Sequence, residues 1–411
     1  MKAVVFHGIG DVRLDEVAQP KIEKPTDAIV RITAAAICGT DLHFVRGTMG
    51  PMKPGTILGH EGIGIVEEDG PAVRNFAPGD RVVIGSTIGC GNCSYCRAGY
   101  YAMCDIANPK GPDSTAFYGG PIESGPFDGL QAEYARVPFA NINMYKLPDE
   151  IDDEQAILLS DIFPTSFMAA ELADICPGKT VAIFGCGPVG QFAIASAKLM
   201  RAGRIFAIDT IESRLEMARE QGAEIINFNQ EDPVETIKGF TNKIGVDRAI
   251  DAVGVDAEAP VKGPAKKAEK ELLKEFEEER KEIAPKTNEQ GGNWHPGSGP
   301  SQVLNWATQA LCKAGTLSII GVYSAQSKRF PIGEAMGKNL TVKMGNCHHR
   351  KYIPLLVDLV RSGVVDPAEV LTQVGPLTSA IDAYKQFDRR EPGWVKVKLE
   401  PEALPELERA A

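Results

Sequence analysis

Three closely spaced glycines, in Gly185-Cys-Gly187-Pro-Val-Gly190, constrain the fold of this chain more than any other segment. The apolar run Thr180 to Phe184 precedes them, and the helical pattern of Val189 to Met200 follows them. A strand, a glycine-rich turn and a helix in this order are typical of a dinucleotide-binding unit. Gly185 permits the tight turn, Gly187 lets backbone amides approach a pyrophosphate, and Gly190 allows the helix to pack closely. The segment therefore predicts a nucleotide-binding βαβ unit.

An acidic residue follows at the distance that such a unit requires. Asp209 ends the next apolar run, about twenty residues beyond the glycines. A carboxylate there accepts a hydrogen bond from the ribose 2′-hydroxyl and repels a 2′-phosphate, so NAD is expected rather than NADP. Pro188 and Val189 lie between the glycines and belong to the same expected contact surface. Arg214 is placed to flank the adenosine, although an exposed helix arginine is the simpler explanation.

The pattern of apolar runs predicts an α/β chain of two domains. Four strand-like runs alternate with helical periods and indicate a doubly wound parallel sheet covered by helices, namely Val181 to Gly185, Ile205 to Asp209, Arg248 to Val253, and Leu317 to Val322. The first 160 residues instead carry short runs such as Arg81 to Ile84, broken by Gly and Pro. A chain of 411 residues exceeds one core. We expect a mostly β domain from 1–160 and 345–411, and a nucleotide-binding domain from 161–344.

An insertion interrupts the second domain at residues 257–300. Its first part is rich in Lys and Glu, and its second part, from Gly291 to Pro300, is rich in Gly and Pro. The expected helix has only a narrow apolar stripe, formed by Leu272, Leu273, Phe276 and Ile283, which predicts packing on the domain surface or on another subunit. A solvated surface helix is the plainer alternative.

Composition excludes several classes of function. The net charge is -11, and no cluster of Lys and Arg of the kind that binds a phosphate backbone is present. No apolar run approaches the roughly 18 residues of a membrane span, and Met1 leads directly into a strand-like segment instead of a signal peptide. We therefore expect a cytoplasmic protein that binds a small molecule and neither nucleic acid nor a membrane.

Four of the nine cysteines fall within one short segment, at Cys90, Cys93, Cys96 and Cys104. In a reducing compartment such a group favours metal ligation over disulfides. Four thiolates satisfy tetrahedral zinc and leave no position open for a substrate, so the predicted site is structural. A redox role is the alternative.

A catalytic zinc needs an open position, and its candidate ligands are scattered along the chain. Cys38 opens the segment Cys38-Gly-Thr-Asp-Leu-His43, and His60 and Glu61 lie in Gly59-His-Glu-Gly62. A single cysteine or histidine is usually a core residue. Together they indicate a second metal site.

These motifs, in this order and spacing, resemble the zinc-containing medium-chain alcohol dehydrogenases over nearly the whole chain except the insertion. The resemblance implies a GroES-like catalytic domain, a Rossmann coenzyme domain and two zinc ions per chain. It implies that Cys38 and His60 bind the catalytic zinc, with Glu61 as an occasional or indirect partner and Asp161 as the third ligand. A carboxylate at Asp161 departs from the two-cysteine, one-histidine set of alcohol dehydrogenase. A helix cap is the alternative role for Asp161.

The segments around Leu158 to Thr165 and Asp128 to Pro138 look like those of the glutathione-independent formaldehyde dehydrogenase branch. The resemblance further implies that Thr165 contacts the nicotinamide side and that Arg350 pairs with the pyrophosphate. Thr40 and His43 then form a proton relay from substrate through the cofactor ribose to solvent. The expected reaction moves a hydride from a small alcohol or a hydrated aldehyde to NAD.

Two rival functions stay open at this point. One is an aldehyde dismutase with permanently bound NAD, in which the insertion, with its loop from Trp294 to Pro300, rests over the cofactor as a lid. The other is a zinc-stabilised binding protein without catalysis. A homo-oligomer, with a tetramer favoured, is expected from the family resemblance.

Overall fold

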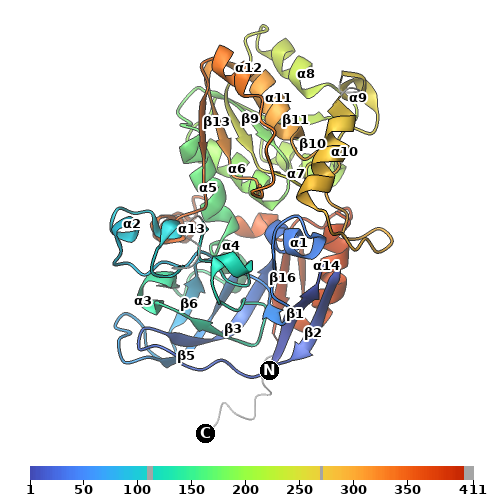
Figure 1. The fold of residues 1–411 in the computed structure, drawn as a ribbon. Helices are drawn as coiled ribbons and strands as arrows, with labels where there is room; N and C mark the ends of the chain where they lie inside the picture. The colour runs from blue at the N-terminus through green and yellow to red at the C-terminus, as the bar shows by residue number, and fades with distance from the viewer. Residues whose placement is uncertain (109–113, 269–271, 402–411) are drawn as a thin grey trace.

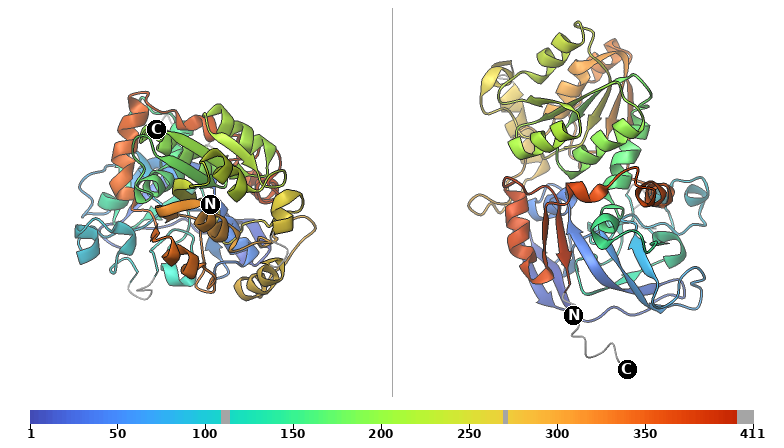
Figure 2. Two further views of the ribbon diagram at one scale, coloured as in Figure 1. Left: turned by 90° about the horizontal axis from the view of Figure 1, so that it is seen from above. Right: turned by 180° about the vertical axis from the view of Figure 1, so that it is seen from behind.

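The computed structural model describes residues 1–108, 114–268 and 272–401, and Figure 1 shows them as two bodies, one above the other, joined at a narrow waist. The upper body is built on one sheet and the lower body on two, and Figure 2 shows helices on both faces of the sheet in the upper body.

The upper body is a six-stranded parallel sheet in the order β11-β10-β9-β12-β13-β14. Its strands are β9 (Thr180–Phe184), β10 (Arg204–Asp209), β11 (Glu224–Asn227), β12 (Val246–Asp251), β13 (Leu311–Ile319) and β14 (Thr341–Met344). Numbered from β9, this order is that of a dinucleotide-binding fold, with the change of direction between β9 and β12. The predicted Rossmann sheet is confirmed.

Alternation along the central strand β9 explains the two cores of this body. Ala182 and Phe184 face one core, and Val181 and Ile183 face the other, because successive side chains of a strand point to opposite faces. One core is closed by α8 (Pro233–Phe240) and α11 (Gln302–Ala310). The other is closed by α5 (Ile162–Leu172), α6 (Pro188–Leu199) and α7 (Glu212–Glu220).

The lower body is mostly β, as expected. A seven-stranded sheet has the order β15-β16-β3-β5-β6-β8, with β7 also paired to β3, and a three-stranded sheet has the order β2-β1-β4. The strands are β1 (Lys2–Gly8), β2 (Asp11–Glu16), β3 (Ala28–Ile37), β4 (Thr56–Ile57), β5 (Gly62–Asp69), β6 (Arg81–Ile84), β7 (Tyr134–Val137), β8 (Met144–Lys146), β15 (Gln373–Pro376) and β16 (Val397–Glu400).

The last strand returns the chain to the first domain. β16 pairs antiparallel with β3 and parallel with β15, so its residues complete the sheet of the lower body. The remaining helices are α1 (Gly39–Arg46), α2 (Ser94–Arg97), α3 (Ala140–Asn143), α4 (Asp153–Leu158), α9 (Gly263–Ala268), α10 (Leu272–Ile283), α12 (Ile332–Gly337), α13 (His349–Arg361) and α14 (Ala380–Asp388), with short 3₁₀ turns at Tyr101–Met103, Ile122–Ser124, Pro367–Val370 and Leu377–Ser379.

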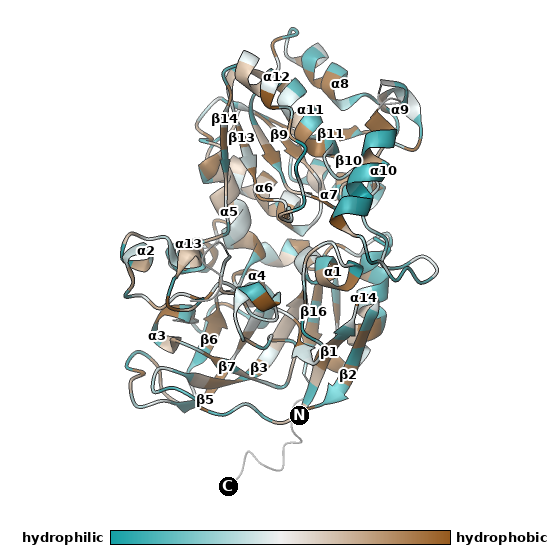
Figure 3. Cartoon of the chain, in the orientation of Figure 1, coloured by the Kyte–Doolittle hydropathy of each residue, from teal (hydrophilic) through white to brown (hydrophobic). Residues whose placement is uncertain are grey.

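The insertion forms α9 and α10 and then a loop that reaches the lower body. Phe276 and Ile283 are buried, while most of α10 is hydrophilic in Figure 3. The loop attaches to the lower body, since Asn288 donates to Ile9 O at 3.0 Å and Trp294 is buried in the same core as Tyr384. Trp294 thus packs into the lower domain and does not border the cofactor cleft, contrary to the lid expected of this loop.

The described part of the chain contains no helix that is long and apolar enough to cross a membrane.

Candidate functional site

A cleft of about 730 Å³ lies between the two bodies. It opens where β9, β10 and β12 end, which is where parallel sheets of this order bind ligands. Residues predicted for three different tasks line it together, namely Cys38, Thr40, His43, His60, Asp161, Thr165, Gly185, Gly187, Pro188, Val189, Asp209 and Arg214.

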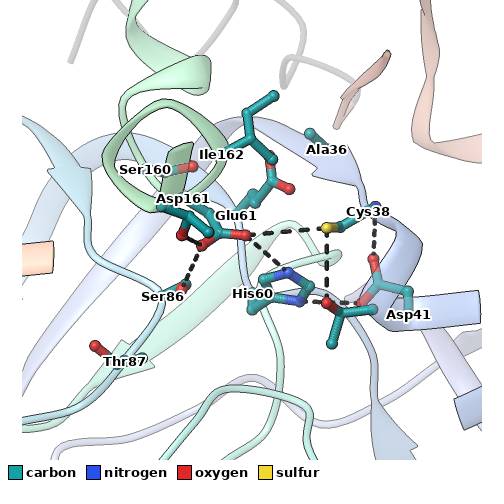
Figure 4. A network of polar contacts seen from close by, with 12 residues as sticks. Ala36, Cys38, Asp41, His60, Glu61, Ser86, Thr87, Ser160, Asp161 and Ile162 are labelled. Atoms are coloured by element: carbon teal, nitrogen blue, oxygen red, sulfur yellow. Dashed lines mark hydrogen bonds and ion pairs between the residues drawn. The ribbon is translucent and has the colours of Figure 1, made fainter. Parts of the chain in front are cut away.

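Cys38, His60 and Asp161 converge at the inner end of the cleft, as Figure 4 shows. Cys38 Sγ lies 3.9 Å from Asp161 Oδ2, and His60 Nε2 lies 3.3 Å from the same oxygen. Each comes from a different element: Cys38 caps α1, His60 precedes β5, and Asp161 precedes α5. Asp161 occupies the N-cap position of α5, but its side chain makes no capping bond. Its carboxylate is turned toward Cys38 and His60 instead.

These distances fit a bound zinc. Ligand atoms placed about 2.0 to 2.3 Å from a tetrahedral zinc are separated from one another by about 3.3 to 3.8 Å. His60 is 1 % exposed, and its two ring nitrogens face carboxylate oxygens, Asp41 Oδ1 at 3.1 Å and Asp161 Oδ2 at 3.3 Å. A zinc ion at Nε2 would match the lone pair of this buried nitrogen, which a carboxylate oxygen does not. The donor set of sulfur, nitrogen and oxygen is one that zinc accepts.

A second layer of side chains holds these three. Asp41 Oδ1 lies 3.1 Å from His60 Nδ1, and Asp41 Oδ2 accepts the Cys38 backbone N–H at 3.0 Å, so one residue both caps α1 and faces the imidazole. The other oxygen of Asp161 is contacted by Ser86 at 3.1 Å, Thr165 at 3.0 Å and His349 at 2.8 Å. Such partners fix the orientation of metal ligands.

The protein shifts the pKa values of all three. Burial raises the pKa of the Cys38 thiol. Burial disfavours the charged form of His60, but the Asp41 carboxylate beside it outweighs this and raises the pKa of His60 well above its usual value. Burial also opposes ionisation of Asp161, yet hydrogen bonds from His349 and His60 hold the pKa of Asp161 well below its usual value. Asp161 is therefore a carboxylate at neutral pH.

Glu61 belongs to the same group of potential ligands but has another partner. Its Oε1 lies 2.6 Å from Lys396 Nζ, and both side chains are fully buried. Glu61 Oε2 has no hydrogen-bond partner among the described residues. Glu61 is thus paired with Lys396, the residue before β16, and lies beside the three other candidate ligands rather than on the cleft wall.

The four cysteines of the loop also converge, with all four sulfur atoms within 4.8 Å of one another. Cys93 Sγ and Cys104 Sγ are 3.9 Å apart, close to the edge of a zinc tetrahedron. Backbone N–H groups point at the sulfurs, for example Cys93 N to Cys90 Sγ at 3.3 Å and Cys96 N to Cys93 Sγ at 3.4 Å. Such donors stabilise thiolates, and although burial opposes it they lower the pKa of Cys93 to about 7.

The nucleotide side of the cleft follows the glycine motif. Gly185 has φ +91°, and a Cβ on Gly190 would lie 1.8 Å from Gly185 O, so both positions require glycine. Gly187 caps α6, whose first turn supplies free N–H groups for a phosphate. Asp209 Oδ2 accepts Cys186 N at 2.8 Å, and Asp209 Oδ1 accepts Thr210 N at 2.6 Å, which fixes the carboxylate at the end of β10.

The basic residues around the cleft differ from the expected set. Arg214 borders it, and so do Arg46 and Arg390. Arg350 does not: it lines a separate small cavity, with its Nη1 3.4 Å from Met144 O. The structure thus places Arg350, on α13, beside β8 and outside the lining of the large cleft, and its pairing with a pyrophosphate stays a prediction.

Sequence reasoning also missed several residues that the fold brings to the site. Asp41 lies inside the Cys38 to His43 segment, and His349 directly precedes the predicted site residue Arg350, so both are neighbours in sequence of predicted site residues. Ser86 carried no signal in the sequence. Its role depends on the approach of β6 to α5, which no local pattern encodes.

Comparison with known proteins agrees with this geometry. Residues 24–149 match the alcohol dehydrogenase GroES-like domain, and residues 188–260 match the zinc-binding dehydrogenase family. The zinc-type alcohol dehydrogenase-like protein AdhB of Bacillus subtilis is 36% identical over 98% of this chain and 100% of its own length. The glutathione-independent formaldehyde dehydrogenase of Pseudomonas aeruginosa is 31% identical over 95% of this chain and 96% of its own length.

A solved structure, alcohol dehydrogenase TADH from Thermus sp. ATN1, superposes with a TM-score of 0.79 at 34% identity, covering 98% of this chain and 100% of that one. Sequence, fold and site therefore agree, and the chain belongs to the zinc-containing medium-chain alcohol dehydrogenase family.

Proposed function

We propose that this enzyme oxidises a small alcohol or a hydrated aldehyde, formaldehyde above all, with NAD as hydride acceptor. One observation carries the proposal: Cys38, His60 and Asp161 share a single cleft with the glycine loop and Asp209. A metal site and a nicotinamide site in one cavity are what hydride transfer to NAD from a polarised hydroxyl requires.

A zinc ion held by Cys38, His60 and Asp161 would supply Lewis acidity that eases loss of the hydroxyl proton. Thr40 would receive that proton, since its Oγ1 lies 3.9 Å from Cys38 Sγ on the cleft wall. His43, also on the wall, would take the proton from the cofactor ribose and return it to solvent. Thr165, next to Asp161, would orient the nicotinamide side.

Asp209 supports NAD as the cofactor, because its carboxylate stands where an adenosine ribose binds. A related structure from Sinorhizobium meliloti, 26% identical, holds NADP, so the choice needs a direct test. Arg214 borders the same end of the cleft and would contact the adenosine side.

The substrate is tested by following NADH formation with formaldehyde, ethanol and benzyl alcohol, each with and without glutathione. We expect the highest kcat/KM with formaldehyde and no effect of glutathione. A strict glutathione requirement would exclude this branch, and turnover only with NADP would exclude the cofactor assignment. No turnover with any alcohol or aldehyde would revive the binding-protein alternative.

A dismutase with permanently bound NAD is the second candidate. The observation in its favour is that Ala257 and Glu258, at the start of the insertion, border the cleft. If NAD is permanently bound, protein that is purified without added cofactor and then denatured should release about one NAD per chain. An ultraviolet spectrum of the released material would detect it. Its absence would remove this candidate.

The homo-oligomer, with a tetramer favoured, also stays a proposal. Ile332 and Met336 on α12 are 73% and 83% exposed, and Met344 on the edge strand β14 is 63% exposed. An apolar surface beside an unpaired strand edge favours association. Light scattering on purified protein tests it.

A further inference from the structure

A buried charge network joins the two bodies beside the cleft. Arg46, at the end of α1, contacts Asp256 Oδ2 at 2.6 Å and Asp388 Oδ1 at 2.8 Å. Asp388 ends α14, and Asp256 follows β12 in the coenzyme domain. Figure 1 shows the segment after α10 running down to α1 and α14 at this place. All three side chains are at most 6 % exposed.

The network touches His43. The Nδ1 atom of His43 lies 2.9 Å from Asp256 Oδ2 and 2.9 Å from Thr48 Oγ1. The Thr48 hydroxyl donates to His43 O at 3.4 Å, so its oxygen faces Nδ1 as an acceptor. A lone pair on Nδ1 would repel the carboxylate, whereas an N–H there is attracted to it. Nδ1 therefore carries hydrogen, and the lone pair resides on Nε2.

Nε2 is free to act. Among the described residues no hydrogen bond to this atom is present, and His43 borders the cleft while being only 4 % exposed. In a neutral imidazole the unprotonated nitrogen is the one that can accept a proton. The side chain thus presents its basic atom to the cavity and its N–H to Asp256.

Asp256 presents its negative charge directly to His43. The two carboxylates Asp256 and Asp388 both contact the Arg46 guanidinium, but Asp388 makes no contact with the imidazole among the described residues. Burial opposes ionisation of Asp256, but Arg46 and His43 hold its pKa below the usual value, so Asp256 stays ionised at neutral pH.

Asp256 is itself held rigidly. Its Oδ1 accepts Gly297 N at 3.2 Å, and its carbonyl accepts Arg390 Nη2 at 3.0 Å. Gly254, two residues earlier, has φ +75° and packs against Val322 with no room for a Cβ. Asp256 directly precedes the insertion, and Gly297 lies near the end of the insertion. The two ends of the insertion therefore meet at the Asp256 carboxylate.

We propose that Asp256 is a positioning residue for the proton relay: it fixes His43 with Nδ1–H toward the coenzyme domain and Nε2 toward the cleft, and it stabilises the imidazolium formed when the alcohol proton arrives. This assignment rests on the proposed function. With NAD as the hydride acceptor, the proton released from the hydroxyl would end on Nε2 of His43 before passing to solvent.

The other charged groups around His43 are accounted for. Arg390 is paired with Glu258 at 3.1 Å, and Arg214, which lines the same cleft, is close enough to Asp209, Arg390 and Arg46 to interact with their charges. Arg46 and Asp388 complete the set, and only Asp256 touches the imidazole.

The test compares two matched variants across mildly acidic to alkaline pH. Asp256→Asn should lower kcat at least about tenfold, with KM, zinc content and NAD affinity little changed. The rise of kcat with pH should move to lower pH, because the imidazole loses a neighbouring negative charge and gives up its proton more readily. An unchanged kcat and pH profile in this variant would overturn the proposal.

Asp388→Asn is the control, since it also removes a carboxylate from Arg46 but none from His43. Asp388 Oδ2 also accepts Trp294 N at 2.7 Å, so this variant should unfold at lower temperature. Its kcat and pH profile should stay at the wild-type values. The same shift in both variants would show that loss of the network, rather than of the His43 contact, is responsible.

A measurement on the wild-type enzyme covers the case in which Asp256→Asn does not fold. The chain has six histidines, and ¹⁵N spectra of their rings report each tautomer. His43, assigned by comparison with His43→Gln, should be protonated at Nδ1 when neutral. Protonation at Nε2 instead would overturn the proposal even in an active enzyme. Wild-type inactivity toward every alcohol would reject the proposed function and leave this tautomer measurement to decide the role of Asp256.

Discussion

Single residues decide whether the cleft can hold a metal. Asp161 contributes one oxygen toward Cys38 and His60 and the other toward Ser86, Thr165 and His349. One oxygen of Asp161 is therefore placed to bind a metal, and the other is held by the neighbouring side chains. Substitutions on the two sides should therefore have different effects.

If the chain binds the two zinc ions that we propose, Asp161→Ala should lower the zinc content by about one ion, because one of the three proposed ligands of the catalytic zinc is lost. Turnover should fall at least about a hundredfold, since Lewis-acid stabilisation is worth several kcal/mol. Ser86→Ala is the control: it removes only a contact to the outer oxygen and should keep both ions. Elemental analysis reads out the result, and full metal content in Asp161→Ala would contradict the ligand assignment.

Thr40→Ala should slow hydride transfer by about 10²-fold, because proton removal loses its first acceptor. Its zinc content should not change, since Thr40 Oγ1 is not a ligand. Thr40→Ser retains the hydroxyl and should keep most of the turnover. The comparison is made by single-turnover kinetics. A Thr40→Ala enzyme with wild-type turnover at neutral pH would refute the relay.

At the scale of elements, the four-cysteine loop is a self-contained unit whose ligands lie within one short stretch. That is why the sequence alone revealed it. Its sulfurs form a closed group, and none of the four cysteines is among the residues that line the cleft, which is the arrangement that the predicted structural zinc site requires.

Cys90→Ser should remove one zinc ion and lower the melting temperature, because structural zinc binding contributes directly to folding. The turnover of the folded fraction should be retained. Cys176→Ser, at an exposed cysteine outside the loop, is the control and should change neither. Calorimetry with parallel metal analysis checks this, and a stable Cys90→Ser protein with two zinc ions would contradict it.

A comparison of the strand ends with the apolar runs of the sequence shows where the local pattern predicts a strand correctly and where it does not. The run Arg81 to Ile84 coincides with β6, and the run ending at Asp209 coincides with the end of β10. β13 begins six residues before the expected Leu317, at Leu311. Its first half contains Ala314 at φ +58° and a register shift against β12, so pairing with neighbours, rather than apolar alternation, extends the strand.

At the scale of the whole molecule, the cleft between the two domains couples cofactor binding to stability. NAD that binds only the folded state should stabilise it by about 2.7 kcal/mol at a hundred times its Kd. NADP should stabilise it less, since Asp209 repels a 2′-phosphate.

Asp209→Ser should reduce this difference between NAD and NADP by removing the repelling charge. Urea unfolding with each nucleotide at equal concentration measures it. Equal stabilisation of the wild-type protein by both nucleotides would contradict the assignment of Asp209.

The sequence by itself determined the Rossmann unit, the mostly β domain and the four-cysteine group, because glycine spacing, apolar periodicity and clustered cysteines are local signals. Cys38 and His60 were candidates from two short motifs, and Asp161 followed only from the family resemblance. Only the tertiary structure decided that Asp161 turns away from helix capping, that Arg46 and Arg390 rather than Arg350 border the cleft, and that Asp256 meets His43. Those contacts join residues far apart in the chain and from different elements. Their distances depend on how the two domains pack, which no local pattern records.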